Sequence, residues 1–315
     1  MNTFKSPILP EIFNSLRRWF DSYHSESHDA GNKQRIDWLR AIPFILLHVA
    51  CLGVLLVGWS PIAVLVAIAL YALRMFAITA FYHRYFSHKA FKTSRAVQFF
   101  FALLGASAVQ RGPLWWASHH RHHHRTSDTH EDNHSPEQSH FLWSHMGWFL
   151  CDRYFPTRHG YIKDFAKFPE LRFIDRFDVL MPLLLAIMLF VAGELLNAYL
   201  PELGTNGWQL VVWGFVISTV VLYHCTFTIN SIAHRFGKRA YPTKDNSRNN
   251  FWLAILTFGE GWHNNHHYYP GSARQGFLWW QIDISYYLLI TMSWLGLIWD
   301  VRAVPAHVYQ EGINS

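Results

Sequence analysis

The chain has 315 residues, of which 51% are hydrophobic, 17% are aromatic and 15% are charged. A soluble domain normally carries about 25% charged residues, so this composition argues against an ordinary soluble protein. The formal net charge of +6 suits nucleic acid, an anionic membrane surface or an acidic ligand. No nucleic-acid motif accompanies the charge, and the apolar segments described below favour a membrane.

The N-terminal segment, residues 1–41, is mostly polar and carries no signal-peptide pattern. Within it, Glu11–Ser22 places apolar residues at helical spacing, with Arg17 and Arg18 elsewhere on the helical wheel. This pattern predicts an amphipathic helix lying on a membrane surface, although an ordinary packed helix explains it equally well. We expect this segment to precede a main unit of residues 42–302, which is followed by a C-terminal tail, 303–315.

Four segments approach the length of about 20 apolar residues that crossing a bilayer requires. They are residues 42–59, 61–82, 179–200 and 208–229. They form two hairpins, whose turns at Trp59–Pro61 and Pro201–Gly207 contain neither Lys nor Arg. By the positive-inside rule, both chain ends and the segments 83–178 and 230–302 then lie in the cytoplasm.

Three further apolar stretches are not predicted to span the membrane. Residues 97–109 and 251–258 are too short to span and read better as helices buried under the cytoplasmic part or dipping into the interface. Residues 279–299 are long enough to span, but a fifth crossing would put the C-terminus outside, so we favour an interfacial helix. The polar run 241–250 reads as an ordinary loop.

Histidine is concentrated in three clusters, at residues 83–88, 120–124 and 263–267, each of which follows an apolar stretch. Neutral imidazole is the commonest metal ligand. At about 100° per residue, the second and third clusters each place three imidazoles on one helical face. These are His120, His123 and His124, and then His263, His266 and His267. His122 points to the opposite face.

The first cluster and the fourth apolar segment add further candidates. His83 and His88 are five residues apart, about 140° around a regular helix, so either the helix breaks or they serve different ions. Asn230 and His234 share a face at the end of the fourth segment. Nine imidazoles and one amide are too many for one ion with an open position and suit two. Imidazole-rich sites suit zinc, copper, iron or nickel, which the spacing alone does not separate.

The other histidines of the polar segments read as structural residues or as residues that support the ligands. They are His119, His122, His130, His134, His140 and His145. His224 lies within the fourth apolar segment, where an imidazole normally faces protein or a cavity, and we leave it unassigned.

At these residues the chain resembles the membrane-bound fatty acyl desaturases, specifically the Δ9 acyl-CoA desaturase type. The matching motifs are His83-Arg-Tyr-Phe-Ser-His88, His120-Arg-His-His-His124, Thr129-His-Glu-Asp-Asn-His134, Asn230-Ser-Ile-Ala-His234 and Glu260-Gly-Trp-His-Asn-Asn-His-His267. The resemblance runs from about residue 40 to 300 and implies an all-α integral membrane protein. Its four transmembrane helices, in two hairpins, would be capped by a helical cytoplasmic domain that carries a histidine-rich dimetal site.

The resemblance also implies a diiron enzyme that uses O2 and two electrons to place a cis double bond in a saturated acyl chain, carried by CoA or by a lipid. The implied iron ligands are His83, His88, His120, His123, His124, His234, His263, His266 and His267, with Asn230 acting directly or through a water. A cytochrome b5 domain fused to some members is not found here. We therefore expect a separate electron donor of the ferredoxin, rubredoxin or cytochrome b5 type.

A CoA headgroup would need cationic partners on the cytoplasmic face, through charge-assisted contacts to phosphate. The candidates are Arg111, Arg121, Arg125 and Arg153. For the acyl chain, a narrow apolar tunnel with a closed end is expected to set the position of the double bond. Two alternatives stay open: a related histidine-box hydroxylase or ketolase, and a non-catalytic membrane protein that binds metal or lipid.

Overall fold

Four long apolar helices dominate the structure, a computed structural model that describes residues 17, 19–25 and 35–313. By length and composition each of these helices can cross a membrane. They are Trp38–Val57, Pro61–Ser87, Leu180–Tyr199 and Gly207–His234. The predicted all-α fold with four long apolar helices is confirmed.

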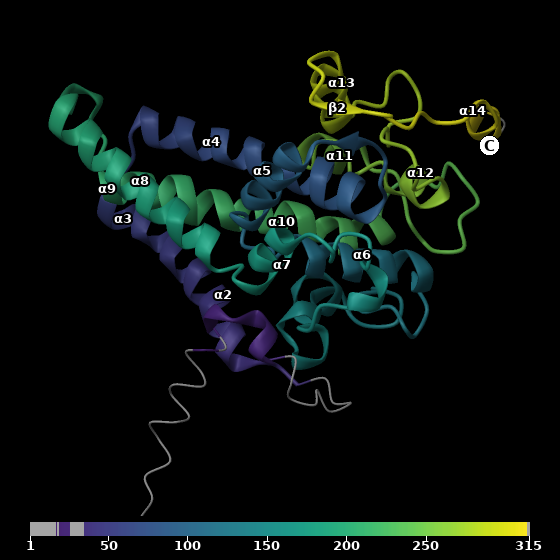
Figure 1. Ribbon diagram of the computed structural model, residues 1–315, viewed down its shortest axis with the longest axis horizontal. Helices are drawn as coiled ribbons and strands as arrows, with labels where there is room; N and C mark the ends of the chain where they lie inside the picture. Colours follow the sequence, from purple (N-terminus) through teal and green to yellow (C-terminus); the bar gives the residue numbers. More distant parts are fainter. Residues whose placement is uncertain (1–16, 18, 26–34, 314–315) are drawn as a thin grey trace, which may run out of the picture.

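Each span except the third is assembled from consecutive helical pieces. The first joins α2 (Trp38–Ala50), η2 (Cys51–Gly53) and α3 (Val54–Val57), and the second joins α4 (Pro61–Phe76) to the π-helix η3 (Ala77–Ser87). The third is α8 (Leu180–Tyr199), and the fourth joins α9 (Gly207–Leu210), η9 (Val211–Ile217), α10 (Ser218–Ser231) and η10 (Ile232–His234). Figure 1 shows α4, α8 and α10 lying side by side, with α2 and α3 running obliquely to them.

The ends of the first two spans follow from local capping. The Asp37 carboxylate accepts a hydrogen bond from Leu39 N at 3.1 Å, so the first helix begins at Trp38 rather than at residue 42. It ends before Gly58, whose φ of 66° lies in the left-handed region that favours glycine. Ser60 Oγ then accepts from Ala63 N at 3.1 Å and starts the second helix.

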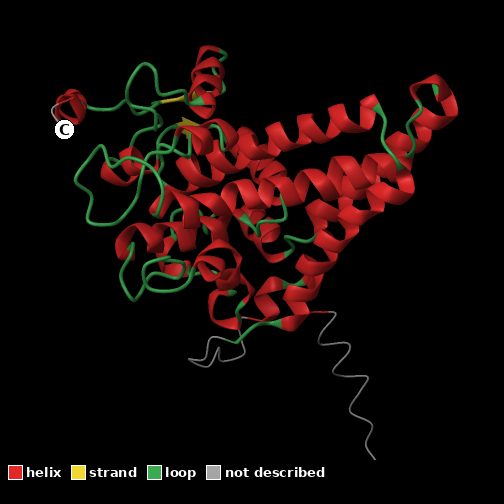
Figure 2. Ribbon diagram, turned by 180° about the vertical axis from the view of Figure 1, so that it is seen from behind, coloured by secondary structure: helices red, strands yellow, loops and turns green. Residues whose placement is uncertain are grey.

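Shorter helices and one small sheet fill the remainder of the described chain, and Figure 2 shows its loops gathered beside the end of the helices where the C-terminus lies. The helices are η1 (Ser22–Ser25), α5 (Arg95–Ala106), α6 (Pro113–Thr126), η4 (Trp143–Gly147), η5 (Trp148–Leu150), η6 (Asp152–Tyr154), η7 (His159–Tyr161), α7 (Pro169–Arg176), η8 (Pro201–Leu203), α11 (Phe251–Leu256), α12 (His263–Tyr268), α13 (Ile284–Trp294) and α14 (Ala306–Ile313). Strands β1 (Lys92–Thr93) and β2 (Ile298–Trp299) pair antiparallel, with Lys92 opposite Trp299.

Two sequence predictions concern segments outside the four spans. The stretch 279–299 contains α13, whose 11 residues extend about 17 Å and so fall short of a hydrocarbon core of about 30 Å. Its predicted position at the membrane interface remains a prediction. Residues 11–16 and 18 of the predicted amphipathic helix Glu11–Ser22 lie outside the described residues.

The largest core lies where the second span meets α5, α6 and α7. Phe81 stacks on Phe101 with ring centroids 3.8 Å apart, and the Tyr82 hydroxyl donates to Ala102 O at 3.0 Å. A Cβ atom at Gly105 would come within 2.2 Å of the Tyr82 ring, so the close approach of α5 requires glycine there. Truncating a buried aromatic such as Phe81 typically costs about 3–5 kcal/mol. This packing fixes the end of the second span.

Candidate metal centre

The nine predicted histidines lie on four helical segments that meet at one end of the helix bundle. The second span supplies His83 and is capped by His88, α6 supplies three, the end of the fourth span supplies His234, and α12 supplies three. The structure gathers all nine into two adjoining groups, which we call the five-imidazole group and the four-imidazole group. Rings of His124 and His267, one from each group, lie 4.5 Å apart between centroids.

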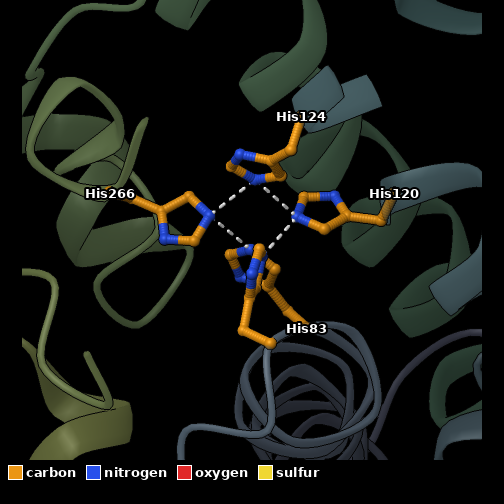
Figure 3. Close-up of side chains that lie close together, drawn as sticks. His83, His120, His124 and His266 are labelled. Atoms are coloured by element: carbon orange, nitrogen blue, oxygen red, sulfur yellow. Dashed lines mark hydrogen bonds between the residues drawn. The ribbon is translucent and has the colours of Figure 1, made fainter. Parts of the chain in front are cut away.

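The five-imidazole group consists of His83, His88, His120, His124 and His266, each with a ring nitrogen within 4.8 Å of the others. The Nε2 atoms of His83 and His266 are 2.9 Å apart, as are those of His88 and His120. Figure 3 shows the labelled imidazoles of this group pointing their nitrogen atoms towards a common centre. Five converging lone pairs cannot all be satisfied by one another, and a cation at that centre would satisfy them.

The four-imidazole group consists of His123, His234, His263 and His267, and its nitrogen atoms also lie within 4.8 Å of one another. The Nε2 atoms of His234 and His263 are 3.1 Å apart. The buried Nε2 of His267 has no hydrogen-bond partner among the described residues. A buried, unsatisfied acceptor facing three other imidazoles is what a metal ligand shows before the ion is added.

Each of the two HxxHH motifs divides its three imidazoles between the two groups. The i,i+4 pair His120 and His124 joins the five-imidazole group, while His123 between them turns to the four-imidazole group. In α12 the pair His263 and His267 joins the four-imidazole group, and His266 crosses to the other. Each of these two helices therefore serves both groups, which holds the two sites adjacent.

The π-helix η3 resolves the spacing of His83 and His88. In a π-helix the hydrogen bonds run from i to i+5, which widens the turn, and His88 caps the end of η3 directly after Ser87. Their ring centroids are 5.0 Å apart, and both belong to the five-imidazole group. Of the two sequence alternatives, a departure from the regular helix is the one the structure adopts.

Buried carboxylates hold the outer nitrogen of four of these rings. Asp132 contacts Nδ1 of His123 at 3.1 Å, Asp128 contacts Nδ1 of His234 at 3.1 Å, and Asp245 contacts Nδ1 of His267 at 2.7 Å. Glu260 contacts Nδ1 of His83 and also accepts from the buried Arg84 at 3.0 Å. Because an ionised carboxylate only accepts, Nδ1 carries the proton and Nε2 keeps its lone pair for a metal.

These carboxylates were not assigned from the sequence, although two of the four lie in motifs quoted above. Asp132 lies in the third quoted motif and Glu260 opens the last one. Asp245 lies in the run 241–250 that reads as an ordinary loop, where nothing in the pattern marks it. Their distribution is uneven: among the described residues, three carboxylates contact the four-imidazole group and one contacts the five-imidazole group.

The protonation states suit a metal. Burial, reinforced by the neighbouring imidazoles, lowers the pKa well below the usual value for five of the rings outside the spans. These are His88, His120, His124, His263 and His266. Burial also lowers the pKa of His267, to about 4, despite the carboxylate of Asp245. For His123, burial acts downwards but the carboxylates of Asp132 and its neighbours outweigh it and raise the pKa. Neutral imidazoles in this number fit a pair of metal ions.

The remaining predicted ligand, Asn230, lies four residues before His234. Its backbone carbonyl accepts from Ser144 Oγ at 2.7 Å, and the residue lines the apolar cavity described below. A ligand role, direct or through a water, remains a prediction.

The other histidines lie around the centre. His122 contacts Thr126 and the Tyr161 ring on the far side of α6, and His119 lies within 3.1 Å of Pro156 O. His134 forms a third close set with His123 and Asp132. In the fourth span His224 bonds to two further histidines, with His145 Nε2 at 3.0 Å and His48 Nε2 at 3.1 Å.

Comparison with known proteins identifies the kind of enzyme that carries this site. The sequence model described as fatty acid desaturase matches residues 58–289, which is more than half of the chain. The chain belongs to the fatty acid desaturase family. Desaturases are oxidoreductases that act on acyl chains, so this protein is an enzyme of that class, and its histidine groups are compatible with a metal site.

The names of the relatives differ in the molecule that carries the acyl chain and in the position number of the double bond. An acyl-CoA 5-desaturase of Anemone leveillei is 38% identical over 273 residues, covering 85% of this chain and 80% of the relative. An sn-1 stearoyl-lipid 9-desaturase of Anabaena variabilis is 36% identical over 276 residues, covering 86% and 95%. A chloroplastic palmitoyl-monogalactosyldiacylglycerol delta-7 desaturase of Arabidopsis thaliana is 40% identical over 244 residues, covering 76% and 62%.

A largely apolar cavity of about 420 Å³ reaches the metal centre of this desaturase. Its lining includes His120, His134 and Asn230, together with aromatic side chains such as Trp116 and Phe227. Cavities of this size and composition are typical of small-molecule sites.

The four arginines predicted for a headgroup lie in different surroundings. Arg111 lines the apolar cavity, where it pairs with Asp178 at 3.1 Å. Arg121 clamps Asp164 with two nitrogens, at 2.9 and 3.0 Å, and donates to backbone carbonyls. Arg125 is exposed and lies 4.8 Å from the Tyr161 ring centroid, and Arg153 lines a separate polar cavity of about 450 Å³. The structure does not bring these four together, and their headgroup role remains a prediction.

Proposed function

We propose that this desaturase introduces a cis double bond, at the Δ9 position, into a saturated acyl chain carried by CoA or by a lipid, using O2 and a diiron centre. The observation that carries the proposal is the pair of imidazole groups opening onto an apolar cavity through His120. The position is supported by a relative whose name carries the number 9, the sn-1 stearoyl-lipid 9-desaturase of Anabaena variabilis.

The nine imidazoles would hold the ions, five on one and four on the other, with Asn230 beside the second. An unactivated methylene group has no useful acidity, so proton transfer alone cannot break its C–H bond. Iron supplies the one-electron chemistry with O2 that this oxidation needs, whereas zinc has no redox chemistry. The carboxylates of Asp128, Asp132, Asp245 and Glu260 keep the rings oriented and their Nε2 atoms free.

The protein around the ions has two further tasks. The cavity walls, which include Trp115, Trp148 and Phe149, hold the acyl chain beside His120 and exclude water. Two electrons must arrive from outside, and we propose a separate carrier of the ferredoxin, rubredoxin or cytochrome b5 type. Neither inter-helix turn of the two hairpins carries Lys or Arg, which supports a cytoplasmic position for both termini and the metal centre.

Product analysis tests the proposal. Cells that express the chain are fed deuterated stearate, and their lipids are analysed by mass spectrometry for an alkene and its position. We expect a Δ9 alkene from the native protein, none from His263→Ala, and an undiminished yield from the exposed control His130→Ala. A hydroxylated product without alkene would identify a hydroxylase instead, and an alkene at another position would correct the Δ9 assignment alone.

A further inference from the structure

Two helical stripes line part of the apolar cavity. From the first span the lining residues are Arg40, Pro43, Phe44 and Leu47, and from the third span and the residue before it they are Val179, Pro182, Leu183 and Ala186. Each set follows the i, i+3, i+4, i+7 spacing of a single helical face. Seven residues of helix cover about 10 Å, so the cavity runs along the first turns of α2 and α8 for that distance.

This wall belongs to the outer surface of the bundle. In the first span 6% of the apolar window is buried, against 50% in the fourth. Leu183 lines the cavity and is nevertheless 44% exposed, so it is in contact with both the cavity and the surroundings. In Figure 1, α2 and α3 run obliquely to α8 and α10. An opening at Leu183 would therefore lie within the apolar length of the third span.

The charges beside this wall are balanced. The two arginines that line the cavity each have a carboxylate partner: Arg40 pairs with Asp37 at 2.5 Å and Arg111 with Asp178 at 3.1 Å. Trp19, which also lines the cavity, donates from its indole N–H to Leu39 O at 2.9 Å. Tryptophan is enriched at the headgroup level of membranes. The several phosphate charges of CoA would find no surplus cation on this lining, whereas an ester-linked lipid needs none.

From these observations, and resting on the desaturase function above, we infer that the cavity opens sideways into the bilayer between α2 and α8. Through this opening, which we call the α2–α8 seam, it takes the acyl chain of an intact membrane lipid. The glycerol and headgroup stay at the interface near Trp19 and Arg40, and the chain reaches His120 and Asn230. The chain then never crosses water, where each exposed methylene group would cost free energy.

A reconstitution with two labelled donors tests the substrate class. The full chain is placed in vesicles of phosphatidylcholine, with iron and a reduced ferredoxin supplied. In one arm the deuterated stearoyl chain is part of the phosphatidylcholine, and in the other it is added as stearoyl-CoA to dioleoyl-phosphatidylcholine vesicles. We expect labelled alkene at least tenfold faster from the lipid. Alkene from stearoyl-CoA alone would overturn the inference and leave the desaturase function standing, whereas no alkene from either donor would refute both.

Variants at the seam test the route. Leu183→Trp fills the seam, and we expect it to lower turnover of the lipid at least tenfold while the iron content is unchanged. Leu184→Trp is the matched control, because Leu184 is 49% exposed but does not line the cavity. Native activity in Leu183→Trp, or an equal loss in Leu184→Trp, would overturn the route.

Discussion

The contact between Asp245 and His267 gives the sharpest test of the proposed metal centre. The carboxylate lies 2.7 Å from Nδ1 of His267, and its other oxygen accepts from Ser247 N at 3.0 Å. Removing a carboxylate that orients a metal-bound imidazole typically costs 10- to 100-fold in affinity or activity, or about 1.4 to 2.7 kcal/mol. The structure predicts where two substitutions fall within that range.

Asp245→Asn keeps the shape and one carbonyl acceptor, so His267 loses only the charge opposite its N–H. We expect a loss of about tenfold in affinity for the iron of the four-imidazole group. Asp245→Ala leaves Nδ1 of His267 without an acceptor in a buried site, and there the loss should approach about 100-fold. The control is Asp300→Asn, because Asp300 forms an exposed ion pair with Lys92. Such surface pairs contribute about 0–1 kcal/mol.

The assay is the iron retained by purified protein across a graded series of chelator concentrations, together with the rate of alkene formation. The reasoning is refuted if Asp245→Ala binds iron as tightly as the native protein. It is also refuted if Asp245→Asn loses more than Asp245→Ala, because then the charge and the acceptor would not act as described.

Three further predictions follow from the same geometry. His123→Ala should remove the iron of the four-imidazole group, whereas His122→Ala, on the far side of α6, should leave the iron content measured by atomic absorption unchanged. Burial lowers the pKa of His122 to about 4 and that of His134 to about 3, from a usual value near 6.5. The unfolded chain therefore binds these protons first, so the melting temperature of metal-free protein should be highest above about pH 6.5 and fall as the pH decreases towards 4. A midpoint that rises on acidification would contradict this sign. Arg84→Ala removes the buried guanidinium that pairs with the carboxylates of Glu260 and Asp283, and it should cost about 3–5 kcal/mol in denaturation, against less than about 1 kcal/mol for the exposed Arg95→Ala.

The sequence predicts which parts of the chain form spans, but not where the helices end. Hydropathy locates the second span from residue 61, yet it stops the helix at residue 82, where the polar residues begin. In the structure the helix continues to Ser87, because residues 83–87 are buried against the core instead of facing water. Hydropathy scores each residue alone, whereas the end of this helix depends on tertiary packing.

The site was predictable to a similar degree. Helical phase brings the three imidazoles of each HxxHH motif to one face and sets His122 aside, and both features are present in the structure. The division into five and four was not predictable, because it depends on how α6 and α12 face each other. The contact of Asp245 with His267 was not predictable either, since a loop residue reaches its partner only through the folded path of the chain.

The π-helix before His88 has a consequence for how related sequences are read. In an α-helix two imidazoles share a face when they are three or four residues apart, so a spacing of five would ordinarily count against a common site. Here the spacing of five reflects the wider turn of the π-helix η3, which takes in almost one more residue per turn than an α-helix. The rings of His83 and His88 nevertheless lie 5.0 Å apart between centroids. A five-residue histidine spacing at the end of an apolar run is therefore itself a sequence signature of a π-helix. Deleting one residue between the two histidines should convert that turn to a regular helix while keeping both rings on one side.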